Sequence, residues 1–207
     1  MRDMPCAPAA EHNSQPILEV LRHEFRAVSS VLEVGSGTGQ HAVAFAAELG
    51  HLEWQTSDLD ENHAGIRLWL AHVGLANVLP PLSLDVGTSS MLPLHYEAVF
   101  SANTAHIMSL QEVEKMFDLV SSALRSDGVF CLYGPLREGG DFNAVSNAEF
   151  DESLRRRDPA MGIRDIEQLD DFASTGAMKR LRRYAMPANN MLVVWRKGWS
   201  GERRDDT

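Results

Sequence analysis

The sequence predicts an α/β fold in which a mostly parallel sheet is covered by helices on both faces. Three observations carry this prediction. Short apolar segments alternate with amphipathic helical patterns, a glycine-rich turn follows the first apolar segment, and two alternating apolar segments joined by a tight connection close the chain. Strands that alternate with helices are typical of parallel sheets with both faces covered. We expect seven strands, the last of them antiparallel.

The first half of the chain carries the opening strand–turn–helix units. A helix over 15–28 places Ile17 and Leu21 on one face, and Pro16 suits its first turn. The strands expected in this half are 31–34, 52–58 and 82–86. A helix is expected after each of the first two strands.

The second half continues the alternation and then departs from it. The strands expected here are 96–102, 128–134, 178–186 and 191–197, and one amphipathic helix covers 109–124. The last two strands are too closely connected for a crossover helix, so we expect an antiparallel hairpin. We predict one domain over 1–207, with an N-terminal cap helix region at 1–30 and an insertion over the active site at 135–177.

Composition excludes several function classes. The 207 residues hold 19 Lys and Arg against 29 Asp and Glu, a formal net charge of -10, which opposes binding to nucleic acid or to an anionic membrane. No segment approaches the roughly 20 apolar residues of a membrane span, and no apolar run of signal-peptide length opens the chain. Cys6 and Cys131 suit unpaired thiols in a reducing compartment. We therefore expect a cytoplasmic protein with a small-molecule partner, and we leave open a homodimer.

The stretch "VLEVGSGTGQHAVAFA", residues 31–46, holds the most informative motif. Glycines at a strand-to-helix turn permit positive φ and let a ligand approach the backbone. Gly35, Gly37 and Gly39 form G-x-G-x-G, whereas a dinucleotide fingerprint is G-x-G-x-x-G. With Glu33 two residues before it, this spacing favours the motif of S-adenosylmethionine-dependent methyltransferases over a nicotinamide site. A tight turn without a ligand is the alternative.

Two aspartates support a nucleoside ligand. Asp58 ends the second expected strand, about 20 residues beyond the turn, where a carboxylate can accept both hydrogen bonds of a ribose diol. Asp60 competes for this role. Asp85 ends the third expected strand. The methyltransferases whose motif the glycine turn resembles have an acid near the adenine amino group at this place, so the resemblance implies that role for Asp85. A solvated or helix-capping aspartate is the alternative at each position.

Longer segments resemble one family. "GSGTGQHAVAFA", "WQTSDLDEN", "ANTAHI", "YGPLREGG" and "MPANNMLVVWRK" are similar to the family that includes methyltransferase-like protein 26, also catalogued as domain of unknown function 938. The resemblance extends from about Pro8 to Lys197. It implies a Rossmann-like class I methyltransferase fold that binds S-adenosylmethionine, and it supplies no substrate. The chain departs from the family pattern at His12, where the family has Arg.

The expected cofactor site combines the glycine turn, the ends of the second and third strands and the loop after the fourth. Its residues are Glu33, Gly35, Ser36, Gly37, Gly39, Gln40, His41, Asp58, Leu59, Asp85, Val86 and Asn103. No cluster of His, Cys and carboxylates has metal-site spacing, so we expect no metal.

The expected catalytic residues follow from the chemistry of methyl transfer. The protein's main task is to hold acceptor and methyl group at near-attack distance, and a general base is needed only when the acceptor carries a proton that must leave. His106 is the candidate base, because "ANTAHIM" follows the fourth strand at the edge where the cofactor should lie. Asn103 in the same loop can orient the substrate, and Tyr133 ends the fifth strand nearby. A packing role for His106 and a helix-capping role for Asn103 are the alternatives.

The expected substrate-binding residues come from an N-terminal lid, the insertion and the final turn. They are Glu11, His12, Asn13, Arg137, Arg164, Asn189 and Asn190. Guanidinium groups can bind a carboxylate or phosphate on the substrate. Asparagines in a tight turn often serve backbone geometry instead.

The sequence therefore predicts an S-adenosylmethionine-dependent methyltransferase. Its acceptor would be a small molecule that is methylated at an O, N or S atom. Both anionic and uncharged acceptors are compatible with the sequence. A module that binds the cofactor without turnover is the alternative. An NAD-dependent oxidoreductase is less favoured, because it predicts a G-x-G-x-x-G turn.

Overall fold

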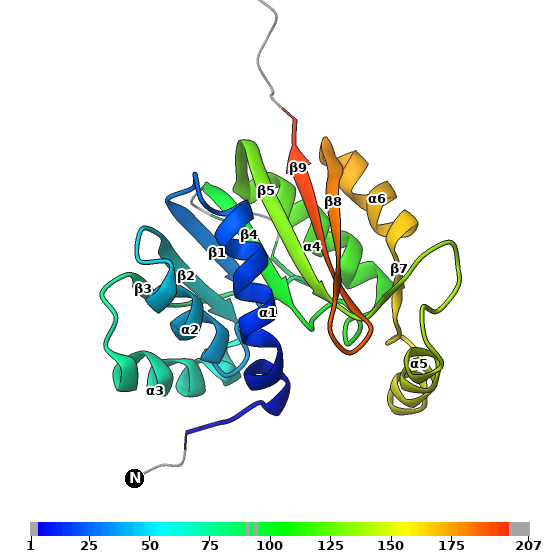
Figure 1. Ribbon diagram of the computed structural model, residues 1–207, viewed down its shortest axis with the longest axis horizontal. Coiled ribbons are helices and arrows are strands. Elements are labelled where there is room, and N and C mark those ends of the chain that lie inside the picture. Colours follow the sequence, from blue (N-terminus) through cyan, green and yellow to red (C-terminus); the bar gives the residue numbers. More distant parts are fainter. Residues whose placement is uncertain (1–3, 90–91, 93–94, 199–207) are drawn as a thin grey trace, which may run out of the picture.

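A computed structural model describes residues 4–89, 92 and 95–198 (Figure 1). Its centre is one seven-stranded sheet with the order β3-β2-β1-β4-β5-β9-β8. In that order the strands are β3 (Val78–Ser83), β2 (Glu53–Asp58), β1 (Ser30–Val34), β4 (Tyr96–Ala102), β5 (Leu124–Gly134), β9 (Asn190–Lys197) and β8 (Met178–Met186). The predicted fold class is thereby confirmed. The ends of the predicted 1–207 domain, residues 1–3 and 199–207, lie outside the described residues.

The direction of the strands follows the prediction. Neighbouring strands are parallel from β3 to β5, and β9 is antiparallel to both β5 and β8. Leu32 of β1 pairs with Val99 of β4, which sets the register at the centre of the sheet. The arrowheads of β4 and β5 point to the same edge in Figure 1. Ligands of open parallel sheets bind beyond this carboxyl edge.

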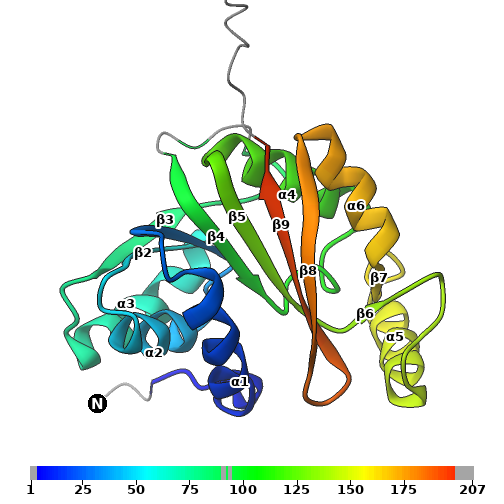
Figure 2. The ribbon, with the colours of Figure 1, turned by 45° about the horizontal axis from the view of Figure 1, so that its top comes forward.

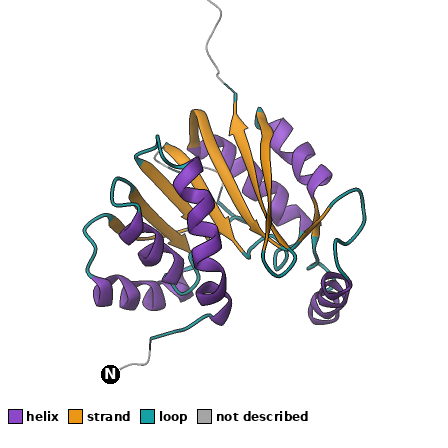
Figure 3. Ribbon diagram, in the orientation of Figure 1, coloured by secondary structure: helices purple, strands orange, loops and turns teal. Residues whose placement is uncertain are grey.

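Five helices pack on the two faces of the sheet (Figure 3). They are α1 (Pro8–Glu24), α2 (Gln40–Glu48), α3 (His63–Val73), α4 (Leu110–Ala123) and α6 (Ile166–Thr175). Along β5, Cys131 and Tyr133 join the core shared with α1 and α2, whereas Phe130 and Leu132 join the core shared with α4 and α6. This alternation makes residues 129–133 of the strand apolar and buried, as expected for a sheet covered on both sides.

Several element boundaries differ from the sequence prediction, those of the third strand and the first helix most of all. The third strand is Val78–Ser83 and not 82–86, because this edge strand tolerates Pro80 and Pro81, whose missing N–H groups cost little at an edge. The first helix begins at Pro8 and not at residue 15, so Pro8 takes the first turn and Pro16 lies inside the helix. The predicted N-terminal lid is therefore the first two turns of α1.

The insertion predicted at 135–177 has two parts, which Figure 2 separates. The first contains β6 (Leu136–Arg137), α5 (Val145–Arg157) and β7 (Arg164–Asp165), and β6 and β7 form a two-stranded parallel sheet. The second part is α6. Its Ile166 and Leu169 are fully buried in the same core as α4, so α6 belongs to the cover of the main sheet.

Candidate functional site

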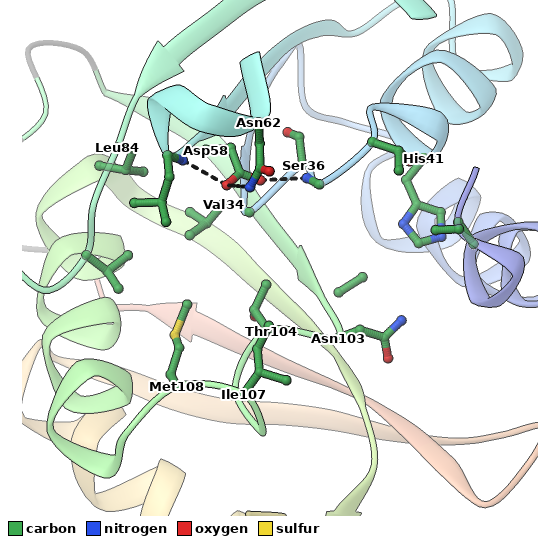
Figure 4. Close-up of a pocket in the computed structure, with 18 of the residues that line it drawn as sticks. Val34, Ser36, His41, Asp58, Asn62, Leu84, Asn103, Thr104, Ile107 and Met108 are labelled. Carbon is green, nitrogen blue, oxygen red and sulfur yellow. Dashed lines mark hydrogen bonds between the residues drawn. The ribbon is translucent and has the colours of Figure 1, made fainter. Parts of the chain in front are cut away.

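A cavity of about 570 Å³ opens at the carboxyl edge of the sheet (Figure 4). It is bounded by the glycine turn after β1, the end of β2, the turn after β3, the loop after β4 and the start of α1. The predicted cofactor residues that line it are Gly35, Ser36, Gly37, His41, Asp58, Leu59, Asp85, Val86 and Asn103. The structure thus brings together residues that are up to 68 positions apart in the chain, from Gly35 to Asn103.

The three glycines of the turn have different physical roles. All have positive φ, at +74°, +58° and +90° for Gly35, Gly37 and Gly39. A Cβ on Gly35 would lie 2.6 Å from the Thr104 side chain, and one on Gly39 would lie 3.1 Å from the backbone of Ile66. A Cβ on Gly37 would meet no protein atom within 4 Å. Gly35 and Gly39 therefore make room for the protein itself, whereas Gly37 faces open space on the cavity wall.

Asp58 connects the end of β2 with the glycine turn. Its Oδ2 accepts a hydrogen bond from the Gly37 N–H at 2.6 Å, and its Oδ1 accepts from the Leu59 N–H and from the Asn62 side chain, each at 2.7 Å. A carboxylate offers about four acceptor positions, so one is left for a ligand hydroxyl. Asp60, the competing candidate, is exposed and does not line the cavity.

Asp85 lies two residues beyond β3 and not at its end, because the strand is shifted toward the amino terminus. Its Oδ1 accepts a hydrogen bond from the Gly87 N–H at 2.8 Å, and this turn holds the carboxylate at the cavity. The neighbouring Leu84 N–H donates to the Asp58 carbonyl at 3.0 Å. The two aspartates are therefore held in adjacent parts of the wall.

Three other predicted cofactor residues, Glu33, Gly39 and Gln40, lie behind the wall. Glu33 is 2% exposed and accepts hydrogen bonds from the Ser36 hydroxyl at 2.8 Å and the Trp54 indole at 3.2 Å. Burial raises its pKa to about 7. The Gln40 side chain accepts from the Ala7 N–H at 2.6 Å, so it ties the N-terminal segment to α2.

The cavity wall is acidic. Four carboxylates line it, from Asp58, Glu61, Asp85 and Glu112, whereas no Lys or Arg is found among the described residues of the wall. Carboxylates gathered around a partly enclosed space create a negative potential inside it. The cavity therefore favours a cationic ligand over an anionic one.

The loop after β4 carries one strained residue at the cavity and one histidine behind it. Asn103 lines the cavity with φ +60°, and its N–H donates to the Tyr133 carbonyl at 2.9 Å. Left-handed non-glycine residues often mark functional sites, and Asn is among the residues that tolerate this conformation. His106 is buried and does not line the cavity, and its ring packs edge-on to Phe150 of α5 at 5.4 Å. Burial first, then the charges of Arg164 and Arg157, lower its pKa to about 4.

A polar cluster lies at the α1 end of the cavity. The ring nitrogen Nε2 of His41 is 2.7 Å from Oδ1 of Asn13, and both side chains are buried. The side chains of Asn13 and Asn190 oppose the rise in the pKa of Tyr133 that burial causes, so they lie near its hydroxyl. Four predicted residues from α1, α2, β5 and β9 are thus brought together.

The family assignment comes from a match that spans residues 4–197 and is described as protein of unknown function, DUF938. The chain belongs to this family. The match covers nearly the whole sequence, including every segment that contributes to the cavity.

Solved structures share the fold of this DUF938 member at low sequence identity. An O-methyltransferase family protein from Burkholderia thailandensis has a TM-score of 0.79 at 11% identity, over 91% of this chain and 57% of that one. The mitomycin 7-O-methyltransferase MmcR has a TM-score of 0.79 at 14% identity, over 92% and 54%. A structure described as PigF with SAH has a TM-score of 0.75 at 16% identity, over 91% and 63%. The chain therefore spans just over half the length of these proteins.

The predicted arginines of the insertion are engaged within the protein. The guanidinium group of Arg164 donates to the carbonyls of Ala105 at 3.0 Å, Met108 and Ala160 at 3.0 Å. Arg137 pairs with Asp165 at 3.4 Å. Neither lines the cavity, and Arg164 instead holds the loop after β4 against the insertion.

The remaining substrate candidates lie outside the cavity wall. Glu11 and His12 are exposed on α1. Asn189 has φ +58°, and its carbonyl accepts from the side chains of Asn143 and Asn147, each at 3.0 Å. This supports the backbone role that was the alternative for the final turn.

Several cavity residues were not among the sequence candidates. They are Ala7, Ala9, Ala10, Val34, Thr38, Glu61, Asn62, Leu84, Ala102, Thr104, Ile107, Met108 and Glu112. Some adjoin predicted residues, such as Asn62 in "DLDEN" and Thr104 in "ANTAHI", so neighbourhood alone could have found them. Ala10 adjoins the predicted Glu11 in the same way, whereas Ala7 and Ala9 had no such signal, because small apolar residues at a helix start are common.

The described residues contain no group of three or more His, Cys, Asp or Glu side chains placed to hold a metal ion. Within the same part of the chain, no helix has both the length and the hydropathy needed to cross a membrane.

Proposed function

We propose that this protein is an S-adenosylmethionine-dependent methyltransferase that acts on a small molecule at an O, N or S atom. The acidic cavity at the carboxyl edge of a methyltransferase-like sheet is the observation that carries the proposal. We also propose that the protein is related to methyltransferase-like protein 26 and that it is located in the cytoplasm.

The charge of the wall distinguishes the two nucleotide cofactors that this type of fold accommodates. Adenosylmethionine carries a sulfonium and an ammonium against one carboxylate, so it is net positive, whereas the pyrophosphate makes NAD net negative. Asp58, Asp85 and the other two carboxylates of the wall attract the former and repel the latter. The G-x-G-x-G spacing agrees with this choice.

The residues present fit an adenosyl group. Asp58 retains one acceptor position for a ribose hydroxyl, Asp85 lies in the next part of the wall, and Gly37 leaves the backbone open to close approach. Leu59 is 41% exposed although it is apolar, so it can cover one face of a purine ring. Adenosylmethionine, when bound, supplies a methyl group on a good leaving group.

The chain's own contribution to the reaction is positioning. Asn103 lines the cavity in a constrained backbone conformation, and its side-chain amide is the group that would orient an acceptor. His106 is neutral at neutral pH and does not line the cavity, so it can accept a proton only from an acceptor that extends beyond the cavity wall. Arg137 and Arg164 give no preference for an anionic acceptor, because both bind partners within the protein.

Calorimetry tests the cofactor. We expect binding of adenosylmethionine and adenosylhomocysteine and none of NAD. Asp58→Ala should weaken adenosylhomocysteine binding by about 10- to 100-fold, the value of a hydrogen bond to a charged group. Asp60→Ala is the matched control, since Asp60 is two residues away and does not line the cavity. Absence of adenosyl ligand binding by the wild type would contradict the proposal.

Turnover on a panel of small hydroxyl, amine and thiol compounds tests the activity. Methyl transfer to any of them supports the enzyme, whereas cofactor binding with no transfer to any class favours the binding module. If His106 acts as a base, His106→Phe should lower kcat by about 100-fold or more. An unchanged kcat would assign it a packing role.

A further inference from the structure

His41 is held in one orientation by three neighbours. Its ring stacks on Phe45 with a centroid distance of 5.1 Å and an interplanar angle of 11°, and it meets Phe100 edge-on at 6.2 Å. Its Nε2 lies 2.7 Å from Oδ1 of Asn13 in α1. The ring therefore has little freedom to rotate or to flip, so its two nitrogens keep their positions.

The contact with Asn13 also determines which nitrogen carries the proton. The Asn13 carboxamide oxygen lies 2.7 Å from Nε2, and an amide oxygen can only accept a hydrogen bond. Nε2 of His41 must therefore be the donor. Because burial lowers the pKa of His41 to about 4, the ring is neutral at pH 7 and Nδ1 keeps an unprotonated lone pair.

This lone pair faces the cavity. His41 lines the wall, and among the described residues no hydrogen-bond partner is found for Nδ1. Figure 4 shows one ring nitrogen directed toward α1 and the other toward the cavity interior, with Asp58 between His41 and Leu84. The ribose candidate thus separates the adenine end of the cavity, near Leu84 and Asp85, from the end at His41.

We propose that His41 recognises the ammonium group at the amino-acid end of the adenosyl ligand through Nδ1, and that Asn13 is the positioning residue that fixes the required tautomer. The inference rests on the proposed function, because the adenosyl ligand is the cofactor proposed there. An ammonium group is a strong donor, and a neutral imidazole nitrogen is an acceptor that carries no repelling charge. The carboxylates elsewhere in the wall attract the same cation without fixing its orientation.

Nitrogen NMR of the wild-type protein tests the tautomer without any ligand or activity. With ¹⁵N-labelled histidine, we expect His41 to show a protonated Nε2 and an unprotonated Nδ1 at pH 7. Asn13→Ala should shift both resonances toward a mixture of tautomers. A protonated Nδ1 in the wild type would overturn the inference and leave the proposed function untouched.

Calorimetry with two ligands tests the recognition. Adenosylhomocysteine has the amino-acid group, whereas 5′-deoxy-5′-methylthioadenosine shares the adenosine and thioether but lacks it. His41→Phe, which keeps an aromatic ring on Phe45, should weaken adenosylhomocysteine about tenfold and leave methylthioadenosine within about twofold. Asn13→Ala should act in the same direction, and Gln15→Ala, exposed on the same helix, should change neither affinity.

The outcomes separate the possible failures. An equal loss for both ligands, or no loss for either, would overturn the role of His41 while the adenosyl site stands. If wild-type protein binds neither ligand, the proposed function fails together with this inference. Should His41→Phe not fold, the tautomer measurement and Asn13→Ala still decide the case.

Discussion

The backbone N–H of Gly37 donates a hydrogen bond to the Asp58 carboxylate, with 2.6 Å between N and Oδ2. This bond joins the glycine turn to the end of β2, and both of its residues line the cavity. Gly37 makes this bond from a left-handed backbone conformation, with φ +58°. The shape of the turn and the position of the ribose candidate therefore depend on each other.

Gly37→Ala tests this coupling. The left-handed conformation costs an L-residue about 1–2 kcal/mol, so the free energy of unfolding should fall by about that amount. The new methyl group would meet no protein atom within 4 Å and would occupy space on the cavity wall. We expect adenosylhomocysteine affinity to fall at least tenfold, as measured by calorimetry alongside urea denaturation.

Gly74→Ala is the matched control. Gly74 has φ +69°, also has no neighbour within 4 Å of an added Cβ, and follows α3 away from the cavity. It should show the same loss of stability without a loss of affinity. A similar fall in affinity for both variants would mean that backbone strain, and not the cavity wall, decides binding.

The sequence could predict the fold more fully than it could predict the candidate site. Alternating strands and helices predicted the sheet because hydrophobic periodicity is local, as in β4 and β8, whose bounds match the expected ranges. The site depends on contacts between distant segments. Nothing in the sequence around Arg164 indicates that its guanidinium group binds backbone carbonyls 56–59 residues earlier. Gly35, by contrast, was found by its spacing, although its contact with Thr104 was not.

Glu33 should make stability depend on pH. Its pKa is about 7 in the folded protein against an ordinary value of 4.5, with burial as the main cause. A carboxyl with a raised folded pKa favours folding below pH 4.5, and this contribution is lost as the pH rises toward 7, because the unfolded chain releases the proton first. At 1.36 kcal/mol for each unit of pKa difference, the loss is about 3 kcal/mol.

Glu33→Gln isolates this effect. A neutral amide oxygen can accept the same hydrogen bonds from Ser36 and Trp54, so the variant should match the wild type near pH 4.5 and exceed it by about 3 kcal/mol at pH 8. His41 and His106 have lowered pKa values, so their protonation destabilises both proteins as the pH falls from 6.5 toward 4. This contribution cancels in the difference between the two free energies of unfolding. Parallel pH profiles from urea denaturation would refute the assignment to Glu33.

Arg164→Met should loosen the loop after β4. Three backbone carbonyls lose their donor, which we expect to cost about 2–3 kcal/mol of unfolding free energy. Because Ile107 and Met108 line the cavity, adenosylhomocysteine affinity should fall as well. The pKa of His106 should rise, since the charge of Arg164 lowers it, and NMR titration measures this. Arg156→Ala, which removes an exposed pair with Glu152, should leave all three quantities nearly unchanged.

The segment before α1 should control ligand release. Pro5 accepts a hydrogen bond from the Trp69 indole at 2.8 Å, and Ala7, two residues on, lines the cavity. Trp69→Phe keeps a ring and removes one hydrogen bond of about 1 kcal/mol, so adenosylhomocysteine should dissociate about fivefold faster in stopped-flow measurements. Arg67→Ala, exposed on the same helix, is the control.

A second variant tests the same segment by steric crowding. A Cβ on Gly65 would lie 3.0 Å from Cγ of Pro5, so Gly65→Ala should push the segment away from α3. Alanine favours a helix interior over glycine by about 1 kcal/mol, which should keep α3 itself at least as stable as before. Faster release of adenosylhomocysteine from a protein that has lost no stability would therefore identify the segment, and not α3, as the barrier. Release at the wild-type rate from both Gly65→Ala and Trp69→Phe would show that residues 5–7 do not limit it.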